Sequence, residues 1–267
     1  MTMRMGFIGD NDLTGVEADA KFAREHGFAG LEYNYWGPFR ELKEDTVKRM
    51  REILDAHGVA CSMLGLWGWN HLSVNAAERQ EAHTMLNRAI DFAQLLRAEL
   101  MVTGAGQIEG APLAEKVKAF NGMFRPFLEK IEAAGMKCAI YAIHGASFLD
   151  RLEAYEAIWE CFPQIGIKYD PANWQHHGAD YLAIIRKCGN RIAHVHIKEH
   201  LYHHGELASQ PAAGMGDIEW GKVMAFLYEH HYDGYLSIEP HGPIWSRGDL
   251  RRTMLLLTQR FINRFLL

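Results

Sequence analysis

Short apolar runs with a period of two alternate with longer amphipathic stretches along the chain. In the run IAHVHIK at 192–198, apolar and polar residues alternate, so that Val195 and Ile197 share one face of a predicted strand. Stretches such as 45–57 repeat apolar residues every three or four positions, which predicts helices. Strands that alternate with helices at this spacing are expected to pair in parallel.

The predicted strands are residues 4–9, 29–34, 59–66, 99–104, 136–143, 165–170, 192–198 and 234–239. The predicted helices are residues 13–26, 45–57, 76–98, 112–134, 149–161, 181–187, 219–231 and 250–265, and residues 199–217 are expected to form a long loop. Strand–helix units of this number and size in a chain of 267 residues predict an α/β fold, a single (β/α)8 TIM barrel over residues 1–267.

Three of the predicted strands end in side chains that bind metals. Asp170, His196 and Glu239 lie at or near the ends of the sixth, seventh and eighth strands, on the face that carries the polar residues. Active sites of such barrels lie at the carboxyl ends of the strands. Two carboxylates and an imidazole suit Mn²⁺, Co²⁺, Mg²⁺ or Zn²⁺. The sequence therefore predicts a site for one divalent cation.

Two of these residues also have a structural interpretation. Asp170 precedes Pro171, which is typical of a helix cap or a turn. A single histidine in a strand is often a hydrogen-bonded core residue. Neither interpretation explains why three successive strands end in Asp, His and Glu, and this coincidence favours the metal site.

Four blocks of sequence carry a resemblance to known enzymes: KYDPANW, IAHVHIKE, GMGDIEW and YDGYLSIEP. They are similar to the sugar phosphate isomerase/epimerase superfamily, the xylose isomerase-like TIM barrels. The resemblance implies a barrel that acts on sugars with a divalent metal. It places the metal ligands at Asp170, His196 and Glu239, and Lys198 matches a lysine that is usual in the family.

The chain departs from the pattern of this family at the fifth strand. The family holds a fourth metal ligand there, a glutamate, whereas the corresponding residue here is Tyr141, or Ala142 in a shifted register. Asn173 stands where many relatives have histidine, and Glu199 replaces a usual aspartate. The two-base epimerisation of the family uses two glutamates, and of these the chain retains Glu239 alone.

We expect a metal-dependent isomerase or epimerase that moves a proton next to the carbonyl of a small sugar or polyol. Glu239 is the predicted base, and Lys198 is expected to stabilise negative charge. Tyr141, His144 or Lys198 would supply a second acid or base, unless His144 only caps the following turn. Because one carboxylate base remains, two alternatives stay open: a lyase of the inosose-dehydratase kind, and a degenerate barrel that binds a sugar without turning it over.

Aromatic and polar residues gather after the second and third predicted strands. Trp67 and His71 are expected to contact the substrate, as are Asn173 and Tyr141. Aromatic faces with a few polar groups suit a sugar. The residues of this expected wall are Tyr35, Trp36, Trp67, Trp69, Asn70 and His71. Alternatively, they pack loops over the mouth of the barrel.

Composition and net charge indicate which classes of binding partner are expected. The net charge of −5 does not favour nucleic acid, which counts against an endonuclease on the same fold. The four cysteines are dispersed without a CxxC pair, and no run of 18 apolar residues is present, so we expect a cytoplasmic protein without membrane contact. The apolar residues 260–267 would suit packing on a second copy of the chain, as in a homo-oligomer.

Overall fold

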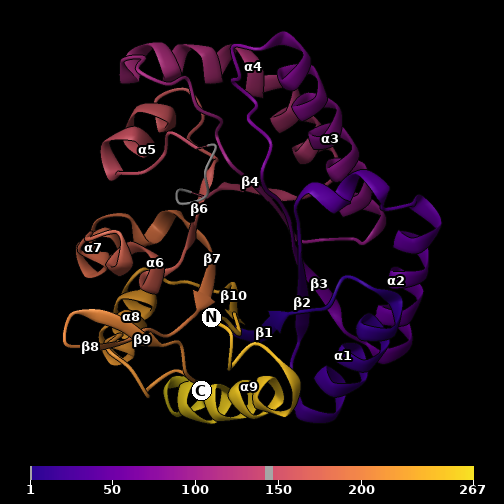
Figure 1. The fold of residues 1–267 in the computed structure, drawn as a ribbon, viewed down its shortest axis with the longest axis vertical. Helices are drawn as coiled ribbons and strands as arrows, with labels where there is room; N and C mark the ends of the chain where they lie inside the picture. Colours follow the sequence, from indigo (N-terminus) through magenta and orange to yellow (C-terminus); the bar gives the residue numbers. More distant parts are fainter. Residues whose placement is uncertain (1, 142–146) are drawn as a thin grey trace. The chain divides into compact units, whose positions relative to one another are not determined.

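A computed structural model describes residues 2–141 and 147–267 of the chain. Over these residues, eight strands close into a parallel barrel in the order β1-β10-β7-β6-β5-β4-β3-β2 (Figure 1). This confirms the predicted TIM barrel. None of the helices in the described part of the chain combines the length and the hydropathy that crossing a membrane requires.

The barrel strands are β1 (Arg4–Ile8), β2 (Gly30–Tyr35), β3 (Ala60–Leu66), β4 (Leu100–Thr103), β5 (Lys137–Ile140), β6 (Gly166–Tyr169), β7 (Ile192–Ile197) and β10 (Tyr235–Ile238). The helices are α1 (Leu13–His26), α2 (Glu44–His57), α3 (Ala76–Leu95), α4 (Leu113–Ala133), α5 (Leu152–Trp159), α6 (Pro171–His176), α7 (Tyr181–Cys188), α8 (Trp220–Glu229) and α9 (Gly248–Ile262). Short 3₁₀ turns form η1 (Gly37–Glu41), η2 (Gly189–Arg191) and η3 (Asn263–Phe265).

The chain divides into two compact units. The first unit comprises Met1–Ile8, Phe28–Gly30 and Tyr169–Leu267. The second comprises Gly9–Gly27 and Leu31–Lys168.

In the second unit, strands β3, β4 and β5 pair in parallel, with Leu64 opposite Met101 and Met101 opposite Cys138. Helices α2, α3 and α4 pack side by side along this unit (Figure 1). Helix α2 buries the stripe that the sequence pattern predicts, and it ends at Gly58, whose φ of 67° suits glycine.

In the first unit, β10 pairs in parallel with both β1 and β7. Ser237 lies opposite His196, and the backbone N–H of Glu239 donates to the carbonyl of Ile197 at 3.1 Å. This register brings the ends of β7 and β10 level with each other, and with them the side chains of His196 and Glu239.

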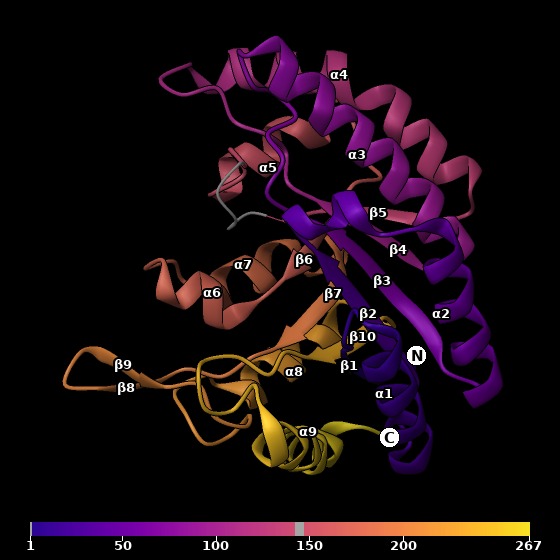
Figure 2. The ribbon, with the colours of Figure 1, turned by 45° about the vertical axis from the view of Figure 1, so that its right-hand side comes forward.

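The expected loop at 199–217 is partly wrong, because it contains a hairpin of β8 (Leu201–His203) and β9 (Glu206–Ser209). The hairpin extends away from helices α8 and α9 of the same unit (Figure 2). Its turn places His204 at φ 50° and Gly205 at φ 83°, the pair of positive values that a tight hairpin turn requires. The strands are too short to show a clear alternation in sequence.

Candidate metal centre

Three residues of the first unit form the candidate metal centre. Asp170 directly follows β6, His196 lies in β7, and Glu239 directly follows β10. One potential ligand atom from each lies within 4.8 Å of the others. Asp170 and His196 are buried, and the side chain of Glu239 is 15% exposed. The structure thus brings together the three residues that the sequence predicts as ligands.

Asp170 uses its two carboxylate oxygens differently. Oδ1 accepts a hydrogen bond from the backbone N–H of Asn173 at 3.0 Å, which caps helix α6. Oδ2 lies 3.8 Å from His196 Nδ1. The same side chain therefore caps helix α6 and lies close to His196.

The carboxylate of Glu239 is surrounded by positive or polarisable groups. His196 Nδ1 lies 2.8 Å from its Oε2, and His241 Nδ1 lies 3.3 Å from its Oε1. Burial raises the pKa of Glu239, but the ammonium of Lys198, the imidazole of His196 and hydrogen bonds from His196 and His241 outweigh burial and hold this pKa well below its ordinary value. Glu239 is therefore ionised near neutral pH.

Lys198 lies between the two carboxylates. Its Nζ is 3.5 Å from Glu239 Oε2 and 4.0 Å from Asp170 Oδ2, and it donates to Asn173 Oδ1 at 3.0 Å. Burial lowers the pKa of Lys198, but the carboxylates outweigh it and raise this pKa above its ordinary value. A permanent ammonium therefore belongs to the centre.

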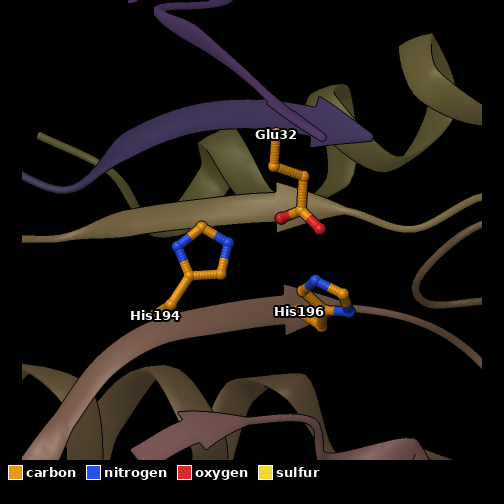
Figure 3. Close-up of side chains that lie close together, drawn as sticks. All are labelled: Glu32, His194 and His196. Atoms are coloured by element: carbon orange, nitrogen blue, oxygen red, sulfur yellow. The ribbon is translucent and has the colours of Figure 1, made fainter. Parts of the chain in front are cut away.

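A second histidine shares the inner face of β7. Figure 3 shows His194 and His196 projecting to the same side of the strand, and their ring centroids are 5.7 Å apart. Both are buried. The same figure draws Glu32 of β2, whose carboxylate accepts a hydrogen bond from Asn34 Nδ2 at 2.7 Å in the second unit.

The donor set of Asp170, His196 and Glu239 fits a divalent cation. It offers hard carboxylate oxygens and one imidazole nitrogen, the combination that Mn²⁺, Co²⁺, Mg²⁺ and Zn²⁺ accept. His196 Nδ1 faces both carboxylates, so it would give up its proton to act as a ligand. A bound cation would share the carboxylates with Lys198.

In the second unit, Tyr141 follows β5 and is buried. Its ring lies 5.6 Å from that of Trp67 and 4.2 Å from the Nζ of Lys168, which also lies 5.0 Å from the Trp67 ring. Trp67 in turn donates from Nε1 to Asn34 Oδ1 at 2.8 Å. The position that the family resemblance assigns to a carboxylate is thus an aromatic ring next to a cation.

The remaining predicted site residues are placed as follows. His71 is buried, and its Nε2 lies 3.0 Å from Thr103 Oγ1. Asn173 adjoins the centre through its hydrogen bond with Lys198. His144 lies outside the described residues. Sequence reasoning assigned no role to Lys168 or His241. Lys168 lies in β6, two positions before Asp170, and His241 follows the end of β10, two positions after Glu239.

A family model described as a xylose isomerase-like TIM barrel matches residues 20–259. The chain belongs to this family. Among curated protein sequences, none matches the chain.

Several solved structures share the fold of this xylose isomerase-like barrel. One is an L-ribulose 3-epimerase, with 17% identity, a TM-score of 0.81, and coverage of 99% of this chain and 94% of that one. Another is a D-allulose 3-epimerase from Methylomonas sp., with 16% identity, a TM-score of 0.78 and full coverage of both chains at 100%. A third is a probable 3-DHS dehydratase from Bacillus anthracis, with 15% identity, a TM-score of 0.72, and coverage of 98% of this chain and 100% of that one. At these identities the likeness supports the fold.

Proposed function

We propose that this xylose isomerase-like barrel is a metal-dependent isomerase or epimerase of a small sugar or polyol. The observation that carries the proposal is the buried set of Asp170, His196 and Glu239, with ligand atoms within 4.8 Å of one another. The 3-epimerases among the similar structures support the substrate class. One of them has also been solved in complex with D-allulose.

In the proposed reaction, Glu239 removes a proton from the carbon next to the substrate carbonyl. The ionised carboxylate can accept a proton, but its low pKa makes it a weaker base than an ordinary glutamate. The Lys198 ammonium, 3.5 Å from the same carboxylate, would face the negative charge that develops on the substrate oxygen. A divalent cation held by Asp170, His196 and Glu239 would acidify that C–H by polarising the carbonyl.

A second candidate is a lyase that removes water from a keto-polyol. The observation that favours it is Tyr141, which is buried against Trp67 where the family resemblance expects a second carboxylate. Elimination needs one base and an acid for the leaving hydroxyl, so a single glutamate suffices. A probable 3-DHS dehydratase shares the fold.

Metal content and proton exchange test the proposal together. Purified protein is analysed for divalent metals, and ketoses and inososes are then incubated with it in D₂O and followed by NMR. We expect a near-stoichiometric metal and deuterium at the carbon next to the carbonyl. His196→Ala should lose the metal, and Glu239→Gln should lose exchange while remaining folded. Glu206→Gln, on the exposed hairpin, is the matched control.

The products separate the candidates. A rearranged ketose supports the isomerase or epimerase, and loss of water supports the lyase. Absence of metal after soaking with Mn²⁺ or Co²⁺ would contradict both and leave the interpretation of a sugar-binding barrel. Full activity of Glu239→Gln would remove Glu239 as the base.

A further inference from the structure

The second unit contains a cavity of about 580 Å³ that none of the proposed chemistry uses. It lies beside the carboxyl end of β2, the turn η1 and the start of α2. Its lining residues are Asn11, Asn34, Tyr35, Trp36, Pro38, Phe39, Glu41, Leu42, Lys43 and Thr46. A volume of this size is within the range of small-molecule sites, roughly 300–1,000 Å³.

One wall of the cavity is an exposed indole. Trp36 is 47% exposed, whereas the nearby Tyr35 of β2 and Phe39 of η1 are buried. Large aromatic side chains are usually covered, because burying them is strongly favourable. An indole that stays open to a cavity offers a flat apolar face to a ligand.

The rim of the cavity combines opposite charges with amide and hydroxyl groups. Glu41 and Lys43 are both exposed and carry charges of opposite sign, so they add no net charge. Thr46 adds a hydroxyl, and Asn11 adds an amide held by its hydrogen bond to the carbonyl of Asn34 at 2.9 Å. Donors and acceptors around an aromatic face match a neutral ligand with many hydroxyl groups.

Helix α3 holds in place the turn η1, which directly follows Trp36. Arg88 donates from Nη1 to the carbonyls of Phe39 and Arg40, at 3.1 and 2.9 Å, and from Nη2 to that of Leu42. Arg40 forms an ion pair with Glu81 of the same helix. The turn η1 that directly follows Trp36 is therefore ordered before a ligand arrives, which lowers the entropic cost of binding.

We infer that this cavity is a second carbohydrate site, which binds a neutral sugar ring by stacking it on Trp36. The ring's C–H face lies against the indole, and its hydroxyls meet Asn11, Glu41, Lys43 and Thr46. This inference does not depend on the proposed reaction.

Methyl β-D-glucopyranoside is a suitable probe because it is neutral and has no free carbonyl for the reaction at Glu239. Its binding is measured by saturation-transfer NMR and titration calorimetry. We expect millimolar binding to the wild type, roughly tenfold or more weaker in Trp36→Ala. His196→Ala should bind as the wild type does. Ile244→Ala, which removes another exposed apolar side chain, is the matched control.

A second variant tests the role of the ordered turn. Arg88→Lys retains the charge but cannot hold three carbonyls in one fork, so it should weaken binding several-fold while Trp36 is still present. Absence of binding to the wild type would overturn the inference, as would equal binding to Trp36→Ala. Binding that is lost in His196→Ala and kept in Trp36→Ala would assign the sugar to the metal centre and overturn it too.

Discussion

The carboxylate of Asp170 accepts the backbone N–H of Asn173 at 3.0 Å through one oxygen and lies 3.8 Å from His196 through the other. The start of helix α6 and one corner of the candidate metal centre therefore depend on a single side chain. The two contributions can be separated, because asparagine caps helices as well as aspartate does but carries no charge.

Asp170→Asn should keep the fold and lose the metal. We expect weaker binding of Mn²⁺ by more than roughly 100-fold, since loss of an outer partner of a ligand alone costs about 10–100-fold. Asp170→Ala should lose the cap as well and destabilise the protein by a further ~1 kcal/mol. Calorimetry and urea unfolding check the two effects. Equal metal affinity in wild type and Asp170→Asn would exclude Asp170 as a ligand.

Lys198→Met should strengthen metal binding and abolish turnover. The ammonium lies 3.5 and 4.0 Å from two proposed ligands, where its charge opposes a divalent cation. Its removal should raise the affinity for Mn²⁺ by about tenfold or more, while the charge on the substrate oxygen loses its partner. Lys222→Met, at an exposed ion pair with Glu219, is the control. Weaker metal binding in Lys198→Met would contradict this electrostatic account.

The stability of the protein should fall in mild acid because of His71. Burial, with a smaller contribution from His83, lowers the pKa of His71 to about 3. The folded state keeps this histidine neutral, whereas the unfolded chain binds a proton below pH ~6.5. The free energy of unfolding therefore decreases between pH ~6.5 and 3, by up to ~1.4 kcal/mol per pH unit.

Urea unfolding at pH 7 and pH 5 measures this effect. His71→Gln should reduce the difference in unfolding free energy between the two pH values by ~2 kcal/mol. His203→Gln, on the exposed hairpin, is the matched control. An unchanged difference in His71→Gln would show that His71 is not the source.

Glu199 holds together the segment that follows β7. Its Oε1 accepts hydrogen bonds from the backbone N–H groups of His200 and Ile218. Its Oε2 accepts hydrogen bonds from the backbone N–H of Gly214 and the indole N–H of Trp220. All four distances are 3.0 to 3.1 Å. Burial raises the pKa of Glu199, and these four hydrogen bonds only partly offset it.

Glu199→Gln should therefore destabilise the protein by roughly 3 kcal/mol or more, because an amide NH₂ would face two N–H donors. Urea unfolding measures the loss, with Glu206→Gln as the exposed control. Equal stability of Glu199→Gln and the wild type would mean that this carboxylate does not hold the segment.

The barrel and its candidate ligands follow from local rules. Alternation along a strand places His196 on the inner face, and parallel strands end at one edge, so that Asp170 and Glu239 join it. These inferences need only the spacing of residues and the type of each side chain, and the sequence supplies both.

Contacts between segments that are distant in the sequence could be identified only from the structure. The hydrogen bonds of Glu199 reach up to 21 positions along the chain, and no pattern in the sequence indicates these partners. The position of Lys168 over the ring of Tyr141 depends on how two strands pair. Trp36 and Trp67 both lie in aromatic-rich stretches that follow predicted strands. Trp36 is exposed, whereas Trp67 is buried. The period of the apolar residues does not indicate whether the residues after a strand are exposed or buried.

The two roles of Asp170 also determine what its conservation in related chains would indicate. A lineage that abandoned its chemistry would still gain from an aspartate that begins helix α6, so selection for folding alone would retain it. His196 has no comparable duty at a helix end. In a set of related chains, an intact histidine at this position would be the better indicator that the centre is still in use.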